Sequence, residues 1–145
     1  MDNSNLPSSS QHRTALAWEA TLPIHIRPMW EQVGKAIDEG MFTLVPQATR
    51  TLVDRVARHL IGKTASFAQS AELLEREGFI TRRDKARLDV LVEAGHASVH
   101  RDLDLTEKQA RVLVHIIENL LRCAFFPQEA VDSVKAVTPP RPRKR

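Results

Sequence analysis

His96 and His100 are the side chains of this sequence best suited to do chemistry. They stand four residues apart in the segment Gly95–His100, which reads GHASVH. On a helix this spacing puts both rings on one face, as two metal ligands or a general acid and base would require. Arg50 lies near the apolar edge of an earlier helical segment and is expected to be partly enclosed. It either reaches toward the histidines or joins Asp54 and Arg58 in a surface ladder of ion pairs four residues apart.

A metal site is not expected at these histidines. The zinc pattern HExxH needs a glutamate after its first histidine, and Ala97 occupies that position. Cys123 is the only cysteine, and no further histidine or acidic cluster follows at ligand spacing. The sequence also has no glycine-rich phosphate loop and no serine or cysteine nucleophile motif, so no cofactor is expected.

Two interpretations of the histidines remain open. In the first, His100 is a general base or acid, His96 is its partner, and a phosphate clamp is supplied by Arg50 or Arg87. In the second, the histidine at a helix junction is structural and bonds to a backbone carbonyl or a carboxylate.

Cys123 lies in an apolar run, which predicts a buried small hydrophobe rather than a nucleophile. A single thiol cannot form an internal disulfide, so a reducing, cytoplasmic location is the simplest interpretation. Residues 1–10 show no signal-peptide pattern, and no stretch of ~18 apolar residues predicts a membrane span. We therefore expect no membrane partner.

The net charge of +3 belongs to the end of the sequence. The segment 138–145, here called the basic tail, holds Arg141, Arg143, Lys144 and Arg145 and no acid. Without those four, 17 basic and 18 acidic residues remain, a net charge of −1. The tail is suited either to contact phosphates without sequence preference or simply to keep the chain soluble.

Hydrophobic periodicity predicts five main helices and a short sixth. Capping boxes open two of them, at Thr81 and Thr106, and Gly95 is expected to interrupt the fourth. The segment 22–28, which contains Pro23 and Pro28, is expected to run extended into the first helix. The helices are expected at about residues 28–39, 43–60, 66–77 (with Ser66 as cap), 81–94, 106–125 and 128–134.

The expected fold is therefore all-α, an antiparallel bundle of about five helices. The sequence predicts three regions: a disordered arm over 1–13, the bundle over 14–137 and the basic tail over 138–145.

Seven motifs follow one another over roughly residues 22–126, namely Leu22-Pro23, the helix that ends at Gly40, Arg50-Thr51-Leu52-Val53-Asp54, Leu73-Leu74, Gly78-Phe79-Ile80, Gly95–His100 and the box at Thr106. This order resembles a bacterial domain of unknown function that is often attached to restriction endonucleases and other defence proteins. That family is similar to the HEPN superfamily of helical bundles.

The resemblance implies which residues form the family motifs. Arg50 matches the family's helical arginine, with Asp54 as the acidic residue that follows it. Gly95 and His100 match a Gly-Asn-x-x-x-His segment in which His96 replaces the asparagine. HEPN ribonucleases carry an arginine shortly before this histidine, whereas residues 92–97 contain none. The resemblance also implies a dimer in which the histidine segments face one another.

Three functions follow as expectations. The first is a non-catalytic helical interaction module, a homodimer that is accessory to a nucleic-acid-related or defence system. The second is a divergent metal-independent ribonuclease that uses His100. The third is a nucleic-acid-binding accessory that acts through the basic tail.

Overall fold

The computed structural model describes residues 17–62 and 69–144, and every regular element in them is helical, which confirms the all-α prediction. The predicted disordered arm and the predicted cap at Ser66 lie outside these residues. None of the described helices has the length and apolar character that crossing a bilayer needs. The elements are η1 (Ala17–Thr21), α2 (Arg27–Asp38), η2 (Phe42–Leu44), α3 (Val45–Ile61), α4 (Ser70–Arg76), α5 (Arg82–His100), α6 (Glu107–Ala124) and α7 (Gln128–Val137).

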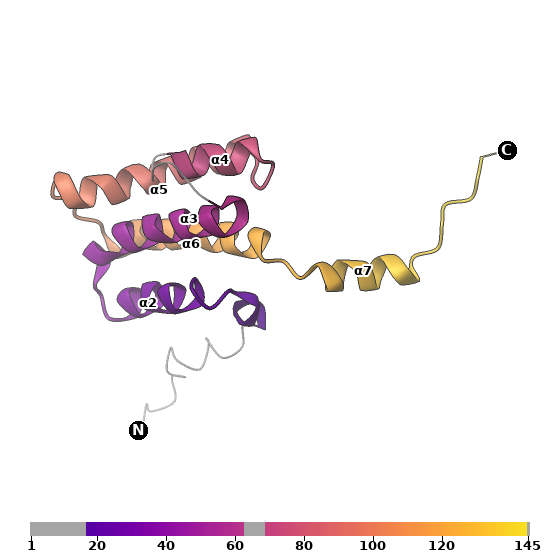
Figure 1. Ribbon diagram of the computed structural model, residues 1–145. Coiled ribbons are helices and arrows are strands. Elements are labelled where there is room, and N and C mark those ends of the chain that lie inside the picture. Colours follow the sequence, from indigo (N-terminus) through magenta and orange to yellow (C-terminus); the bar gives the residue numbers. More distant parts are fainter. Residues whose placement is uncertain (1–16, 63–68, 145) are drawn as a thin grey trace, which may run out of the picture.

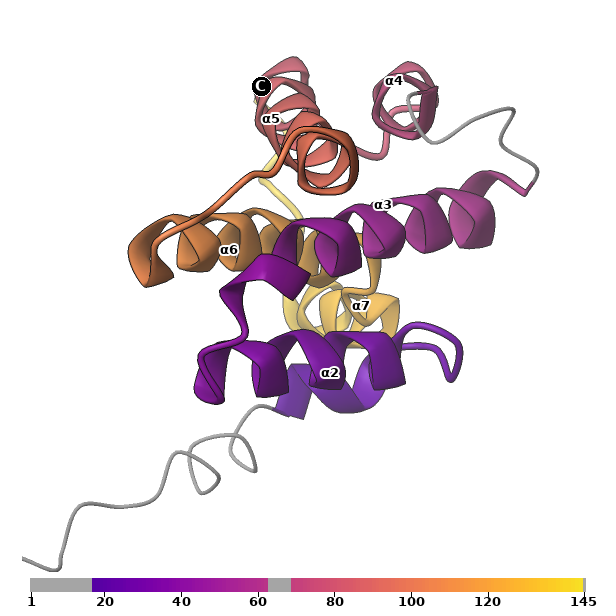
Figure 2. The ribbon, with the colours of Figure 1, turned by 90° about the vertical axis from the view of Figure 1, so that its left-hand side faces the viewer.

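Helices α2 to α6 pack in three layers around α3 (Figure 1). α3 and α6 lie side by side in the middle layer, α4 and α5 cover one side of it, and α2 covers the other (Figure 2). α3 runs antiparallel to both α2 and α5. α7 continues beyond the end of α6 and lies away from the bundle.

The central position of α3 follows from its apolar residues, which surround most of the helix. Its buried side chains include Val45, Leu52, Val53 and Val56. These positions cover more of the helix circumference than the single apolar stripe of an ordinary surface helix. Thr49 is buried among them, and its hydroxyl donates to the carbonyl of Val45 at 2.8 Å. A helix that is apolar over so much of its surface must be covered on several sides, and α2, α4, α5 and α6 cover it.

Both predicted capping boxes are present. The Thr81 hydroxyl accepts from the backbone N–H of Asp84 at 3.1 Å, and the Thr106 hydroxyl accepts from that of Gln109 at 3.2 Å. Each third-position side chain bonds back to the threonine N–H. These contacts satisfy backbone donors that would otherwise lack partners at the helix start, so they fix where α5 and α6 begin.

The prediction of an extended segment over 22–28 is wrong. The backbone N–H groups of Ile26 and Arg27 both donate to the carbonyl of Pro23 at 2.9 Å, which makes a turn. Leu22 and Ile26 are both buried, and one turn places side chains four residues apart on the same side. Burial of these two side chains therefore overrides the preference that the prolines suggest.

The prediction that Cys123 is buried is also wrong, since its side chain is exposed. α6 turns Ala110, Leu113, Ile117 and Leu120 into the core. Three residues beyond Leu120, Cys123 lies outside that buried stripe, at the edge of a groove between α5 and α6.

Gly95 does not interrupt α5, which continues through it to His100, and this corrects the sequence prediction. The reason for a glycine is contact with a neighbouring helix. A Cβ at position 95 would lie 2.7 Å from Cβ and 2.8 Å from Cδ of Arg50, and 2.9 Å from the carbonyl oxygen of Pro46. Such separations are well inside van der Waals contact, so α5 approaches α3 closely only because this position has no side chain.

We predict that Gly95→Ala lowers the free energy of unfolding by about 1–3 kcal/mol, because the added methyl forces α3 and α5 apart. Helix propensity alone predicts the opposite sign, a gain of up to about 1 kcal/mol. Urea denaturation followed by circular dichroism measures the change.

Ala86→Gly, at an exposed position of the same helix, reports the propensity effect alone and should cost roughly 0.5–1 kcal/mol. A stabilised Gly95→Ala protein would show that the close contact does not constrain the fold.

Candidate functional site

The two predicted histidines lie together at the surface. His96 and His100 are both exposed in the last turns of α5, and their ring centroids are 4.6 Å apart. The helical spacing predicted this proximity. The structure therefore presents an adjacent pair of imidazoles to solvent, with each ring able to offer a donor or an acceptor.

Arg50, on α3, packs against Gly95, the residue that precedes His96. Its Cβ and Cδ occupy the space left by Gly95, and its Nε is buried. The aliphatic part of Arg50 is thus fixed in the contact between α3 and α5. The structure brings Arg50 and the histidine segment together, although they are more than forty residues apart in sequence.

An ion pair between Glu93 and Arg101 lies beside the histidines. The hydrogen bond and charge of Arg101 lower the pKa of the Glu93 carboxyl, and the charges of His96 and Arg50 act in the same direction to a smaller extent. Because the pKa is lowered on folding, the pair stabilises the folded state above the ordinary pKa of a glutamate. This contribution is lost as the pH falls through the lowered value.

The structure does not bring Arg87 to the histidines. It stands nine residues before His96 on the same helix, about 14 Å along the axis. Its Nη1 donates to Asp84 at 3.5 Å, and its side chain lines the groove between α5 and α6. The suggested phosphate clamp at this position is therefore not part of the histidine site.

Asp54, the acidic residue that the resemblance singled out, is inside the protein, with 5% of its surface exposed. Its carboxylate accepts from Ser70 of α4 at 3.3 Å and pairs with Arg58 at 3.2 Å. It therefore joins α3 to α4 and holds an arginine, rather than facing the histidine pair.

A groove of about 450 Å³ lies between the first half of α5 and the second half of α6. Its wall is mostly apolar, and the exposed side chains of Phe79 and Val112 contribute to it. Arg87 and His115 supply polar groups, and Cys123 lies at the end nearest α7. The groove has no signal in the sequence because it is formed between two helices.

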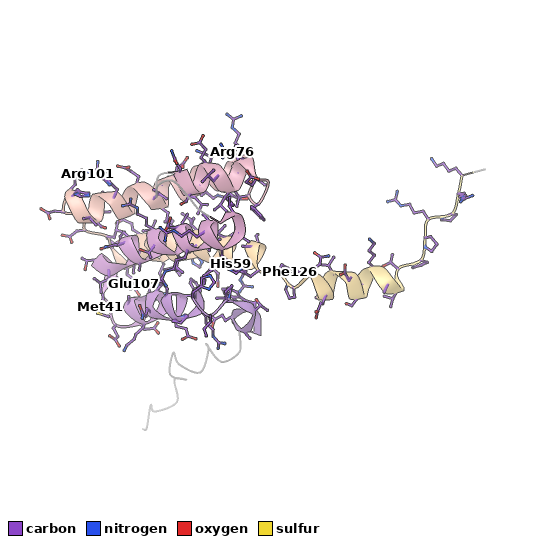
Figure 3. The ribbon with its side chains drawn as sticks, in the orientation of Figure 1. Met41, His59, Arg76, Arg101, Glu107 and Phe126 are labelled. Atoms are coloured by element: carbon purple, nitrogen blue, oxygen red, sulfur yellow. The ribbon has the colours of Figure 1, made fainter. Side chains whose placement is uncertain are left out.

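A second histidine pair lies at the other end of the bundle. The Nδ1 atom of His59, on α3, is 3.1 Å from Nε2 of His25, in the turn before α2. Figure 3 shows His59 and Phe126 at the end from which α7 departs, and Arg101 at the opposite end. The two histidine pairs therefore form separate sites.

In the described part of the chain, no group of three or more histidine, cysteine or acidic side chains is arranged to hold a metal ion. Of the basic tail, Arg141, Arg143 and Lys144 are exposed in the extended segment after α7, and Arg145 lies outside the described residues. Contact of this tail with nucleic acid stays a prediction.

We predict that Arg101→Gln raises the pKa of Glu93 toward the ordinary glutamate value, because the hydrogen bond and the charge that lower it are both removed. An NMR titration of the Glu93 side-chain carboxyl measures the shift. Arg111→Gln is the matched control, since Arg111 pairs with Glu107 instead. An unchanged Glu93 titration in the Arg101 variant would contradict the ion pair.

Comparison with known proteins places the chain in a family but adds no relative of known activity. Neither the curated proteins nor the solved structures give a match. A family model described as "Domain of unknown function (DUF4145)" matches residues 31–137, about three quarters of the chain. The match covers α3 to α7 and most of α2, and so includes Arg50, Gly95 and both histidines of α5. The chain therefore belongs to the DUF4145 family of domains of unknown function.

Proposed function

We propose that this chain is a self-association module in which α7 of one copy docks in the groove between α5 and α6 of a second copy. The observation that carries the proposal is an amphipathic helix whose apolar side is uncovered. Val131, Val134 and Val137 recur at helical spacing on α7, and the last two are 63% and 80% exposed.

The length of α7 supports the need for a partner. It has 10 residues, whereas isolated helices shorter than about 12–15 residues are marginal in water. α7 buries no residue against the described bundle. Its apolar side therefore needs an apolar surface elsewhere to hold the helix in place.

The groove offers a matching surface. Phe79 and Val112 present apolar area there, with 50% of Val112 exposed. Arg87 and His115 supply polar groups at the edge of the groove, and Arg87 is already paired with Asp84 there. Glu129 and Asp132 lie on the polar side of α7, so they stay in solvent when the valines dock. An apolar centre with a polar rim is typical of a helix-in-groove contact.

A second copy is the occupant that fits the connection. α7 runs onward from the end of α6, and only Phe125–Pro127 join the two helices, so α7 points away from the groove of its own chain (Figure 1). A helix of ten residues is about 15 Å long and about 10 Å wide, so two reciprocal docking events bury on the order of 600 Å² in total. That area is typical of a weak interface, so the dimer should form only as the protein concentration rises.

The proposal extends to the wider role expected from the sequence: a HEPN-like module in the cytoplasm, accessory to a nucleic-acid-related or defence system. Its support is the motif geometry, since Gly95 and His100 share one helix and Arg50 packs against that glycine. The exposed thiol of Cys123 fits a reducing compartment.

We predict that Val134→Asp converts a dimer into a monomer, because it places an unpaired carboxylate in the apolar contact. Val112→Asp, on the groove side, should have the same effect. The dissociation constant should rise by about tenfold or more, measured by light scattering over a concentration series. Ala136→Asp is the matched control, since it adds the same charge to the opposite side of α7 and should leave the dimer intact.

Cys123 reports where α7 docks, because it lies at the groove. Its alkylation should be slow in the dimer and faster in the Val134→Asp protein. A wild-type chain that stays monomeric at all concentrations would overturn the proposal. So would a monomer with a protected thiol, since α7 would then lie in its own groove.

A second candidate function is metal-independent RNA cleavage at the other end of the bundle. The observation in its favour is the exposed pair His96 and His100, with Arg50 packed against Gly95 of the same segment. Two imidazoles at such a separation can act as general acid and general base on one phosphodiester, with a guanidinium nearby to stabilise negative charge.

For this second candidate we predict that His100→Ala lowers the rate of RNA cleavage by about 100-fold or more. The melting temperature should hardly change, because His100 is exposed. His115→Ala, at another exposed histidine, is the control and should cleave at the wild-type rate. A wild-type protein without cleavage would exclude this candidate and leave the self-association proposal in place.

A further inference from the structure

A basic pocket of about 440 Å³ lies where the turn before α2 meets α3. It is separate from the α5–α6 groove and from the histidine pair of α5. Its lining combines two arginines, two histidines and two apolar residues, namely Arg55, Arg58, His25, His59, Ile24 and Pro28. As far as the described residues go, the lining contains no carboxylate.

Both arginines of this pocket are held in place by other groups. Nη1 of Arg55 donates to the backbone carbonyl of His25 at 3.0 Å. Nε of Arg58 pairs with Asp54 at 3.2 Å, and Asp54 is buried and also bonded to Ser70. A guanidinium has five N–H donors, so each arginine keeps several for a ligand while one donor fixes its position.

The histidines complete a polar wall. His59 Nδ1 and His25 Nε2 are 3.1 Å apart, so one ring donates to the other. That contact leaves the second nitrogen of each ring for a further partner. The edge of the Phe125 ring packs against His59, with centroids 5.3 Å apart. The wall is therefore preorganised by contacts from three elements, including the end of α6.

This arrangement suits a phosphate group better than a carboxylate. Guanidinium groups match phosphate oxygens by paired hydrogen bonds, and a dianion balances two arginines more fully than a single negative charge does. Asp54 offsets part of the charge of Arg58 from below, but it is buried, so the pocket surface stays basic. A site of this kind recognises phosphate through charge and donor geometry together.

The pocket is too large for phosphate alone, and one side of it is apolar. Its volume lies in the range of about 300–1,000 Å³ that is typical of small-molecule sites. Ile24 is 89% exposed at its edge, and Pro28 lies beside it. An exposed aliphatic side chain next to imidazole rings offers a surface to a flat, weakly polar ring. We infer that this pocket binds the phosphate group of a mononucleotide, with the base against Ile24 and the histidines.

Calorimetric titration of the full chain with AMP tests this inference, with adenosine and inorganic phosphate as comparison ligands. AMP should bind saturably, phosphate more weakly and adenosine hardly at all. Arg55→Gln should raise the dissociation constant for AMP by about tenfold or more, because a charge-assisted hydrogen bond is lost. Arg76→Gln, on α4, removes the same charge far from the pocket and should change it by less than about twofold.

Ring NMR signals of His25 and His59 give a second readout that does not depend on the arginine variants, and AMP should shift both. If inorganic phosphate binds as tightly as AMP, the pocket is a phosphate site but the proposed contact with the base is wrong. If adenosine binds as tightly as AMP, the proposed phosphate site is wrong. Absence of saturable AMP binding, or binding that Arg55→Gln leaves unchanged, would overturn the inference. None of these outcomes bears on self-association through α7, which is measured separately.

Discussion

The close packing of α5 on α3 at Gly95 is the contact on which the rest of the structure depends. α3 is the central helix, and its partner in the outer layer approaches so near that any side chain at position 95 would meet Arg50 and the carbonyl of Pro46. The same contact fixes the aliphatic part of Arg50 against the glycine that precedes the exposed histidines. One missing Cβ thus sets both the separation of two layers and the arrangement of the candidate site.

The sequence predicts the elements well because their signals are local. The capping boxes at Thr81 and Thr106 depend on residues three positions apart, and both helices start where the boxes predict. The apolar periodicity of α2, α3 and α6 likewise identifies most of the residues that the structure buries. The proximity of His96 and His100 follows from the same helical repeat.

What the sequence could not predict depends on contacts between distant segments. A glycine in a helical pattern is ambiguous: it either ends the helix or permits close packing, and only the position of Arg50 shows that Gly95 does the second. Cys123 belongs to an apolar run, yet the rotation of α6 turns it outward. The spacing of Arg55 and His59 does indicate one face of a helix, but nothing local indicates that His25 joins them.

The position of α7 determines where the basic tail lies relative to the bundle. The bundle carries little net charge, whereas the tail beyond α7 holds four basic residues. α7 lies between them, so a docked α7 determines where those charges act. With α7 in the groove of a second copy, the tail of each chain lies over its partner, and its attraction for phosphates is added to a surface that has little of its own. Self-association and the attraction of the tails for phosphates would then reinforce one another, because each dimer presents two basic tails on one scaffold.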